Sequence, residues 1–356
     1  MDLTHLRKKI DSLDVQIVAL LNERAGITLS IGKEKRKNKK SIYTPEREKQ
    51  VLARIRGLNR GPLSKQSLEA IYREIMSGSL SLENEKPSRI AHLGPKASYT
   101  HMAALEKFGQ SVGYIACDNI PDVFNRVEHG DCDYGVVPVE NSNEGAVTHT
   151  FDMLVDSDLK ICSQTLMPIA HNLLANVSMN KIKQIYSNSQ VFGQCRQWLM
   201  VNMPKAELFD AVSSARAAQM TAKKKNAACI ASELAARVYG LKILKKNIQD
   251  NNAHNITRFL VLSRVDAGPT GRDRTSLVFS IKDKVGALHA MLTPFYKNKI
   301  NLTKIESRPS KKKAWDYYFF VDCEGHQKDK AVARALGQLE GMCKFMKILG
   351  SYPVLD

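Results

Sequence analysis

The strongest constraint on the fold is an apolar rhythm near the start of the chain. Apolar residues recur there at alternating steps of four and three, at Leu6, Ile10, Leu13, Ile17 and Leu20, and again at Ile27 and Ile31. This period predicts one helix of about 30 residues. Such a helix is too long to be covered within a small domain, so we expect a second copy of the chain to cover its seam.

Two more helices are predicted after the first one. Thr44 has the character of an N-cap, because Pro45 and Glu46 follow it, and this second helix extends to about Leu58. A third helix is expected after Ser64, which is its predicted cap. These segments predict an all-helical domain over residues 1–86.

Short apolar runs then alternate with helical stretches. The strands are predicted at 90–93, 113–115, 134–138, 169–175 and 259–263. This alternation predicts an α/β domain over residues 88–265, with two lobes and a last strand that returns to the first lobe. Residues 274–356 are predicted to run strand, helix, strand, strand, helix, strand, the ferredoxin-like α+β order. The fold class is therefore multidomain.

Composition excludes several classes of function. The chain has 53 Lys and Arg against 36 Asp and Glu, but this excess is spread over all three segments and is not interleaved with aromatic residues. We therefore expect anionic metabolites as partners and no nucleic acid. Because no apolar run approaches the about 20 residues of a membrane helix, and the start lacks a signal-peptide core, we expect a cytoplasmic protein with no membrane partner.

Cofactor motifs are missing from the sequence. The seven cysteines form no C-x-x-C pair and their number is odd, which argues against a zinc cage and against a disulfide framework. There is no Gly-x-Gly-x-x-Gly motif and no Walker loop, so nucleotide cofactors are disfavoured. We expect neither a metal nor a cofactor.

One position in the first helix breaks its own rhythm. Arg24 stands where the seam requires an apolar residue, and a charge there is costly unless it is paired. Lys35 lies 11 residues further on, about 20° around the helix, and so shares its face. Arg7 lies about 100° off that face and is expected to reach the site of a neighbouring copy.

Further polar residues accompany this cationic face. Arg47 and Glu48 fall in the first turn of the second helix, and Ser79 and Glu83 are spaced four residues apart on the third. The set predicts a pocket for a compact polyanion. The alternative is an amphipathic bundle with surface salt bridges. Of all these residues, that alternative accounts least well for Arg24, a charge in the apolar seam.

These residues resemble the all-helical chorismate mutase family. The resemblance is carried by Leu6-Arg7-Lys8-Lys9-Ile10-Asp11, Leu20-Leu21-Asn22-Glu23-Arg24, Gly32-Lys33-Glu34-Lys35 and Glu46-Arg47-Glu48. It implies that chorismate rearranges to prephenate, a pericyclic step without a nucleophile or proton transfer. It also implies that Arg7 of a partner chain, Arg24 and Arg47 bind the carboxylates, while Lys35 faces the ether oxygen.

The same resemblance assigns the remaining polar residues of the pocket. Glu48 would hold the ring hydroxyl, with Ser79 beside it. Some family members carry Gln at the position of Glu83, where a donor to the ether oxygen is needed. Because a carboxylate cannot donate, Glu83 must be protonated for the reaction.

In the middle segment, polar residues lie at the ends of predicted strands, where α/β crevices place ligands. They are Glu140, Asn141, Ser142, Ser187, Gln194 and the Thr257-Arg258-Phe259 run. Capping or turn chemistry explains any one of them alone. Together with Leu93-Gly94-Pro95, Ser98-Tyr99-Thr100-His101 and Asn247-Ile248-Gln249-Asp250, they resemble prephenate dehydratase.

This resemblance implies that prephenate loses carbon dioxide and its ring hydroxyl to give phenylpyruvate. Aromatisation drives the step, so no cofactor is needed. Thr257 would hydrogen-bond the leaving hydroxyl, and Arg258 would bind the retained carboxylate or serve a structural role. The pocket would be completed by Glu140, Asn141, Ser187 and Gln194, with Ser142 and Phe259 as substrate contacts. The chain departs from the family pattern at Ala97, Ala215 and Gln249.

The C-terminal segment resembles ACT regulatory domains that bind phenylalanine. Gly286-Ala287-Leu288 falls at a strand-to-helix turn and Glu306-Ser307-Arg308-Pro309 at a strand end, and Gly350-Ser351-Tyr352-Pro353 supports the match. A helix N-terminus offers N–H groups to an amino-acid carboxylate. The resemblance implies a dimeric L-phenylalanine site that includes Asn301. Val285 replaces a proline that often precedes the glycine.

The leading hypothesis is thus a bifunctional chorismate mutase, an isomerase, and prephenate dehydratase, a carbon–oxygen lyase, with feedback inhibition by L-phenylalanine. A second hypothesis makes arogenate a substrate of the same fold. A third is an amino-acid-sensing binding protein without catalysis. Retention of Thr257 with the Arg7, Arg24, Lys35 and Arg47 set argues against the third.

Overall fold

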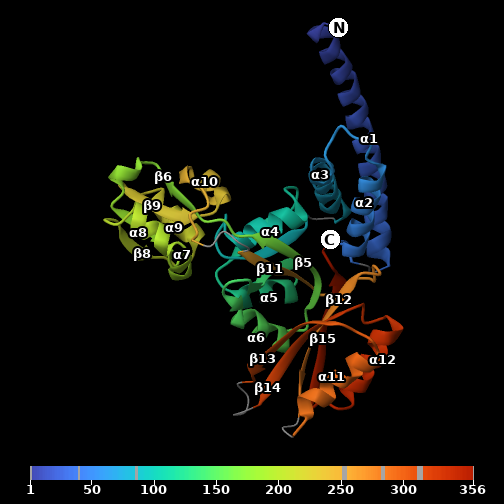
Figure 1. Ribbon diagram of the computed structural model, residues 1–356. Coiled ribbons are helices and arrows are strands. Elements are labelled where there is room, and N and C mark those ends of the chain that lie inside the picture. Colours follow the sequence, from blue (N-terminus) through green and yellow to red (C-terminus); the bar gives the residue numbers. More distant parts are fainter. Residues whose placement is uncertain are drawn as a thin grey trace. The chain divides into compact units, whose positions relative to one another are not determined.

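A computed structural model of the chain describes residues 2–38, 41–84, 87–250, 255–281, 285–310 and 316–355 (Figure 1). It contains two compact units, one of Met1–Arg89 with Lys107–Gly113 and the other of Ile90–Glu106 with Tyr114–Asp356. We call them the helical unit and the α/β unit. Lys86 and Trp315, which delimit a predicted domain and a predicted strand, lie outside the described residues.

The helical unit contains the predicted helices. They are α1 (Leu3–Lys37), α2 (Pro45–Leu58) and α3 (Lys65–Glu83). Ser64 caps α3 as predicted, since its hydroxyl accepts from the Ser67 N–H at 3.0 Å. Pro45 opens α2 as predicted, although the side chain of Thr44 makes no capping hydrogen bond.

Helix α1 is longer than predicted, at 35 residues, and it carries the exposed seam. Its buried residues are Thr28 and Gly32, in the half that lies against α3. A Cβ at Gly32 would collide with the backbone of Glu83, so this glycine permits the close approach of the two helices. Leu6, Ile10 and the rest of the apolar seam up to Leu20 stay exposed in the single chain.

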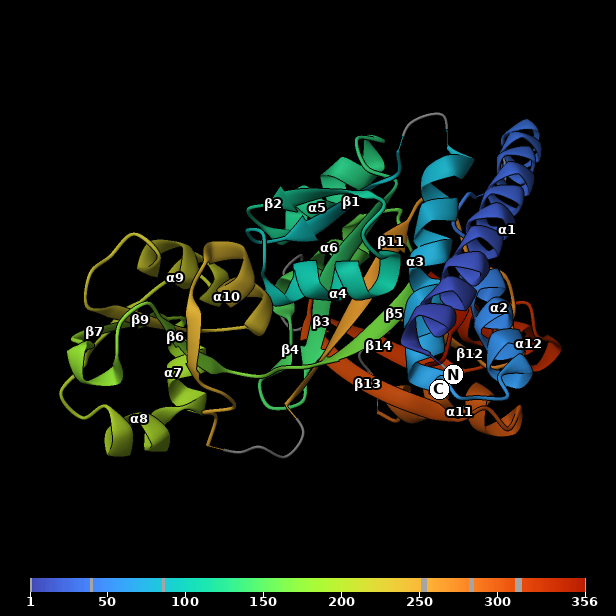
Figure 2. The ribbon, with the colours of Figure 1, turned by 90° about the horizontal axis from the view of Figure 1, so that it is seen from above.

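In the α/β unit, the first sheet has the order β2-β1-β3-β11-β5, with β4 paired to β3. Its strands are β1 (Arg89–Leu93), β2 (Gly113–Cys117), β3 (Tyr134–Asn141), β4 (Gly145–Ala146), β5 (Lys160–Pro168) and β11 (Ile256–Ser263). Helices α4 (Tyr99–Phe108), α5 (Ile120–Glu128) and α6 (Thr148–Asp156) connect them. Figure 2 shows β11 between β3 and β5, which confirms the predicted return of the last strand to the first lobe.

The second sheet forms the other lobe and has the order β10-β6-β9-β7-β8. Its strands are β6 (Asn172–Ala175), β7 (Gln184–Ser187), β8 (Glu207–Asp210), β9 (Ala227–Ala231) and β10 (Lys242–Lys245). The helical segments of this lobe are η1 (Met179–Lys181), α7 (Ser189–Gln194), α8 (Arg196–Asn202), α9 (Ser214–Thr221) and α10 (Glu233–Tyr239).

The predicted strand at 169–175 is wrong in its extent. The chain leaves β5 at Pro168, passes through Ile169–His171 and enters β6 only at Asn172, so the apolar run spans the crossing from one lobe to the other. Ile169 and His171 are buried like strand residues. Hydrophobic pattern alone therefore cannot mark this crossing.

The C-terminal domain confirms the predicted ferredoxin-like order. Its elements are β12 (Asp273–Ser280), α11 (Ala287–Lys297), β13 (Leu302–Pro309), β14 (Tyr317–Glu324), α12 (Lys330–Glu340) and β15 (Phe345–Pro353), and the sheet order is β13-β14-β12-β15. Leu277 and Phe279 pack with residues of α11 and α12, which cover one face of this sheet (Figure 1). Val278, Phe320 and Tyr352 instead join the core of the first lobe. The sheet therefore buries both faces.

Gly350 marks the closest approach between β15 and the first lobe. Its φ is +150°, and an added Cβ would lie 2.8 Å from the Ile161 nitrogen. We expect Gly350→Ala to destabilise the protein by about 1–3 kcal/mol, because a packed interface must open to admit the methyl group. Thermal unfolding measures this. Gly337→Ala in α12, where a Cβ meets nothing within 4 Å, is the control and is expected to be neutral or stabilising. Equal melting of the two variants would contradict this account.

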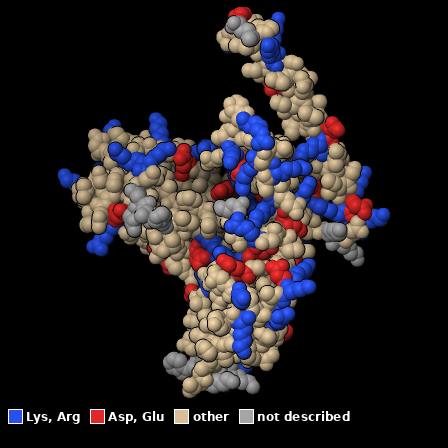
Figure 3. All heavy atoms as spheres, turned by 45° about the vertical axis from the view of Figure 1, so that its right-hand side comes forward, with Lys and Arg blue, Asp and Glu red and all other residues tan. Residues whose placement is uncertain are grey.

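The surface charge is distributed as the sequence predicts. On the face drawn in Figure 3, Lys and Arg lie over many elements with Asp and Glu among them. None of the helices in the described ranges combines the length and apolarity of a membrane span. Within the same ranges, no group of three or more His, Cys, Asp and Glu side chains is placed to hold a metal ion.

Candidate active sites

A pocket of about 500 Å³ lies among the helices of the helical unit. The predicted residues that line it are Arg24, Lys35, Arg47, Glu48, Ser79 and Glu83. The expectation that Arg24 and Lys35 share one face of the first helix is confirmed. Arg7 is not among the lining residues; it lies 17 positions before Arg24, about 25 Å along the helix axis.

Hydrogen bonds pair the side chains of α1 with those of α3. Arg24 donates to the hydroxyl of Ser79. The Nζ of Lys35 lies 2.7 Å from Oε2 of Glu83 and 2.6 Å from the carbonyl oxygen of Ile42. Lys35 and Glu83 thus form a mostly buried ion pair in the lining of the pocket.

The pocket also contains cations that the sequence analysis missed: Arg54, Arg73 and Lys107. Arg54 follows Arg47 by seven residues, two turns along the same helix face, and this spacing could have found it. The Nζ of Lys107 lies 3.0 Å from Oε2 of Glu48, to which Tyr43 also donates at 2.6 Å. No sequence signal links Lys107 to α2. The excess of cations over carboxylates in this pocket suits a small dianion.

A second cavity, of about 560 Å³, lies between the lobes of the α/β unit. We call it the crevice. Of the predicted residues, Asn141, Gln194, Thr257 and Phe259 line it. Glu144, His171 and Asn255 also line it and were not predicted as site residues.

The hydroxyl of Thr257 lies in the crevice lining and is hydrogen-bonded to Asn141. Its Oγ1 accepts from Nδ2 of Asn141 at 2.8 Å. The orientation of this amide follows from its other end, because Asn141 Oδ1 accepts from the N–H groups of Asn143 at 2.9 Å and Glu144 at 3.0 Å. Within the described residues no acceptor is found for the hydroxyl proton of Thr257, so this proton is available to a ligand in the crevice.

A chain of amides crosses the crevice and joins its two lobes. Asn141 Nδ2 donates to Asn255 Oδ1, and Asn255 Nδ2 donates to Gln194 Oε1, both at 2.8 Å. Gln194 Nε2 donates to Glu144 at 2.8 Å, and its Oε1 lies 2.8 Å from Nε2 of His171. Burial lowers the pKa of His171 despite the hydrogen bond to Gln194, so its imidazole is neutral at pH 7.

Four predicted residues of this segment lie outside the crevice lining. Ser187 is fully buried, and its hydroxyl donates to the carbonyl of Ile230 at 2.8 Å. The hydroxyl of Ser142 accepts from the Ile256 N–H at 3.0 Å. Arg258 and Glu140 form an ion pair at 2.9 Å on the opposite face of their strands from Thr257. Of the two roles left open for Arg258, its contacts match the structural one.

The three residues that depart from the family pattern, Ala97, Ala215 and Gln249, lie in different parts of the α/β unit. Ala97 lines the crevice with a φ of +69°, a left-handed conformation that costs an L-residue about 1–2 kcal/mol. Its N–H donates to Nδ1 of His101 at 3.1 Å, which helps hold it there. Ala215 is buried in the first turn of α9. Gln249 accepts from the N–H of His171 at 3.1 Å.

The predicted phenylalanine motifs lie at the start of α11 and along β13. Gly286 has a φ of +76° and precedes Ala287, the first residue of the helix. The Glu306–Pro309 run closes the edge strand β13, and Leu288 and Val285 are exposed. Asn301 donates to Glu324 at 3.2 Å. Residues 282–284, before this glycine, lie outside the described ranges.

Comparison with known families agrees with this division of the chain. Residues 6–84 match the family model of type II chorismate mutase, residues 90–267 that of prephenate dehydratase, and residues 275–341 that of the ACT domain. The fold and the family matches thus define a chain that joins two catalytic domains to an ACT domain.

Curated relatives combine chorismate mutase and prephenate dehydratase in one protein. A bifunctional chorismate mutase/prephenate dehydratase of Aquifex aeolicus is 48% identical over 99% of this chain and 98% of its own length. A protein of the same name from Stutzerimonas stutzeri is 41% identical over 98% of this chain and 96% of its own. The chain belongs to the bifunctional chorismate mutase/prephenate dehydratase family.

A solved structure supports the fold of the α/β unit. The prephenate dehydratase of Arthrobacter aurescens in complex with L-Phe is 33% identical, with a TM-score of 0.69. The match covers 75% of this chain and 90% of that one.

Proposed function

We propose that the chain converts chorismate to prephenate in the helical unit and prephenate to phenylpyruvate in the crevice. The observation that carries the proposal is the hydroxyl of Thr257, which accepts from Asn141 and keeps its own proton for a ligand. The family relationship over 99% of the chain supports the same assignment.

The mutase step needs a pocket that holds the compact form of a dianion. Arg24 and Arg47 bind the two carboxylates, while Lys35 and Glu83 face the ether oxygen on which negative charge develops. The reaction is a rearrangement, so the pocket supplies orientation and charge stabilisation without a covalent intermediate. Arg7 of a second copy completes the site, and pairing of the exposed α1 seams makes the enzyme a homodimer.

Glu83 makes the mutase sensitive to pH. In the unliganded pocket it is ion-paired with Lys35 at 2.7 Å, but a donor to the ether oxygen must carry a proton. We expect mutase kcat/KM to fall as pH rises, because the ether oxygen requires a donor and a carboxylate cannot donate. Glu83→Gln donates at every pH, so its profile should be flat, as pH–rate measurements on supplied chorismate test. A pH dependence that the substitution leaves unchanged would refute this role.

The dehydratase step removes a carboxylate and a hydroxyl from one ring. Prephenate takes up one proton and yields phenylpyruvate, carbon dioxide and water. As the C–O bond breaks, the hydroxyl of Thr257 donates a hydrogen bond to the leaving oxygen, which takes up the proton and departs as water, while the electron pair of the carboxylate C–C bond enters the ring. Asn141 holds Thr257 in place, and Phe259 supplies an apolar wall beside it.

Regulation belongs to the C-terminal domain. L-Phenylalanine binds with its carboxylate at the start of α11 and with its remaining polar contacts along β13, and it inhibits the dehydratase. We place the enzyme in the cytoplasm, where its substrates are metabolites.

A three-arm assay tests these activities. Purified protein is given chorismate, prephenate or arogenate, and the loss of each substrate and the formation of phenylpyruvate or phenylalanine are followed, with and without added phenylalanine. Turnover of chorismate and prephenate supports the proposal, and preference for arogenate would redirect it. Binding of phenylalanine without any turnover would favour a sensor instead.

A further inference from the structure

Strand β11 carries two polar residues in succession that face opposite sides of the first sheet. Thr257 lines the crevice, whereas Arg258 points toward the C-terminal sheet, because successive side chains of a strand alternate. The neighbouring strand β3 repeats this arrangement, since Asn141 is in register with Thr257 and Glu140 with Arg258. One peptide unit therefore separates each crevice residue from a charged residue behind it.

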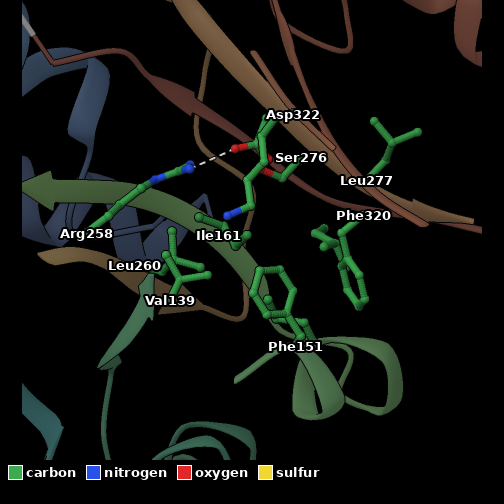
Figure 4. Close-up of a pocket in the computed structure, with 12 residues that line it drawn as sticks. Val139, Phe151, Ile161, Arg258, Leu260, Ser276, Leu277, Phe320 and Asp322 are labelled. Atoms are coloured by element: carbon green, nitrogen blue, oxygen red, sulfur yellow. Dashed lines mark hydrogen bonds and ion pairs between the residues drawn. The ribbon is translucent and has the colours of Figure 1, made fainter. Parts of the chain in front are cut away.

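The C-terminal domain holds the guanidinium of Arg258 with several acceptors. Arg258 Nη1 donates to Asp322 Oδ2 at 2.8 Å, and Nη2 donates to the hydroxyl of Tyr352 at 2.6 Å. Figure 4 shows Arg258 directed at Asp322, with Ser276 beside the carboxylate. Arg258 is 6% exposed, and a buried cation that loses its anion is left uncompensated at high cost. A displacement of Asp322 therefore acts directly on Arg258, which Glu140 holds from the other side.

Strand β13 contacts the first lobe just before its phenylalanine motif and within it. Lys304, two residues before Glu306, forms an ion pair with Glu140. Arg308, two residues after Glu306, donates to the hydroxyl of Thr148 at 3.2 Å, and Thr148 lines the crevice. Lys304 also stands in register with Asp322 of β14. Both anions that hold Arg258 thus respond to the position of β13.

The cluster keeps its charges although it is largely enclosed. Burial alone would raise the pKa of Glu140, but the hydrogen bonds and charges of Lys304 and Arg258 hold it below its ordinary value. A cavity of about 20 Å³, the room of one water molecule, adjoins Arg258, Lys304 and Asp322. The charged side chains therefore border a small free space whose other walls are mostly apolar.

We propose that Lys304 and Arg258 are positioning residues of a relay that links phenylalanine binding at β13 to Thr257 in the crevice. Phenylalanine displaces β13, Lys304 and Asp322 transmit the shift to Glu140 and Arg258, and Thr257 and Asn141 lose their alignment. The relay rests on the proposed dehydratase activity and its inhibition. Because coupling between two sites is reciprocal, prephenate in the crevice weakens phenylalanine binding by the same factor.

The first test replaces Lys304 and leaves the crevice intact. In Lys304→Met, dehydratase kcat and KM on supplied prephenate should stay within about twofold of the unmodified enzyme, while maximal inhibition by phenylalanine is largely lost. Lys304→Arg keeps the ion pair and should restore inhibition. The matched control is Lys330→Met, since Lys330 is exposed on α12 away from the first lobe.

The second test measures the coupling itself. On a Thr257→Ala background, which binds prephenate with little turnover, calorimetry gives the Kd of phenylalanine with and without prephenate. With Lys304 in place, we expect prephenate to raise the Kd of phenylalanine about 5- to 150-fold, the usual range for linked sites. When Lys304→Met is added to this background, the ratio should fall to about 1.

The outcomes separate the relay from the function on which it rests. If phenylalanine fails to inhibit the unmodified enzyme, the proposed regulation is wrong and the relay falls with it. If it inhibits the unmodified enzyme and Lys304→Met alike, the relay alone is overturned. Loss of phenylalanine binding in Lys304→Met also overturns the relay, because Lys304 would then be a ligand contact.

Discussion

Replacing Thr257 by alanine is expected to lower the dehydratase kcat by about 10²- to 10³-fold, the usual effect of removing one donor to a developing oxyanion. The structure gives the physical reason, since Asn141 donates to Thr257 and leaves the threonine proton for the leaving hydroxyl. Steady-state assays on supplied prephenate measure the effect.

Two controls accompany this variant. Thr257→Ser keeps the hydroxyl and should retain most of the dehydratase activity. If the serine variant were as inactive as the alanine variant, the hydroxyl would not be the donor to the leaving oxygen. Mutase activity on chorismate should be unchanged in both variants, because Thr257 and the mutase pocket lie in different units of the chain.

The second large effect is expected at Arg24. Arg24→Ala removes a cation from the mutase pocket, together with its hydrogen bond to Ser79, and should lower mutase kcat/KM by about 10²- to 10³-fold. Arg24→Lys should recover only part of the loss, since an ammonium cannot reproduce the planar fork that a guanidinium offers to a carboxylate.

The matched control for Arg24 is Arg60→Ala, at an exposed arginine beyond the end of α2. This variant should leave the mutase rate on chorismate unchanged. In Arg24→Ala, the dehydratase rate on supplied prephenate should also stay unchanged. Equal mutase rates in Arg24→Ala and Arg60→Ala would show that the pocket does not bind chorismate as proposed.

Local sequence rules predicted the parts of the sites that lie on one element. The heptad break at Arg24 and its spacing to Lys35 placed both cations in one pocket, as the structure confirms. Ser64 and the return of β11 were predicted from a cap and from the alternation of strands and helices. Each of these features depends on a periodicity, on the alternation of strands and helices, or on the chemistry of one helix end.

Features made by distant parts of the chain could not be predicted in this way. Lys107 reaches Glu48 across 59 positions, and Asn255 joins Asn141 and Gln194 only after the chain has returned from the second lobe. The crossing at Ile169 was predicted as strand because the run is apolar, and in the structure it is buried as a strand would be. Arg258 was singled out as a candidate substrate contact, but the fold shows that it faces away from the crevice.

One measurement tests the central claim most directly: a time course of chorismate, prephenate and phenylpyruvate with the unmodified protein, Arg24→Ala and Thr257→Ala. The account predicts that chorismate becomes phenylpyruvate in the unmodified protein, that prephenate accumulates in Thr257→Ala, and that Arg24→Ala processes only supplied prephenate. If both variants consume chorismate and neither accumulates prephenate, the assignment of the two steps to these two sites is contradicted.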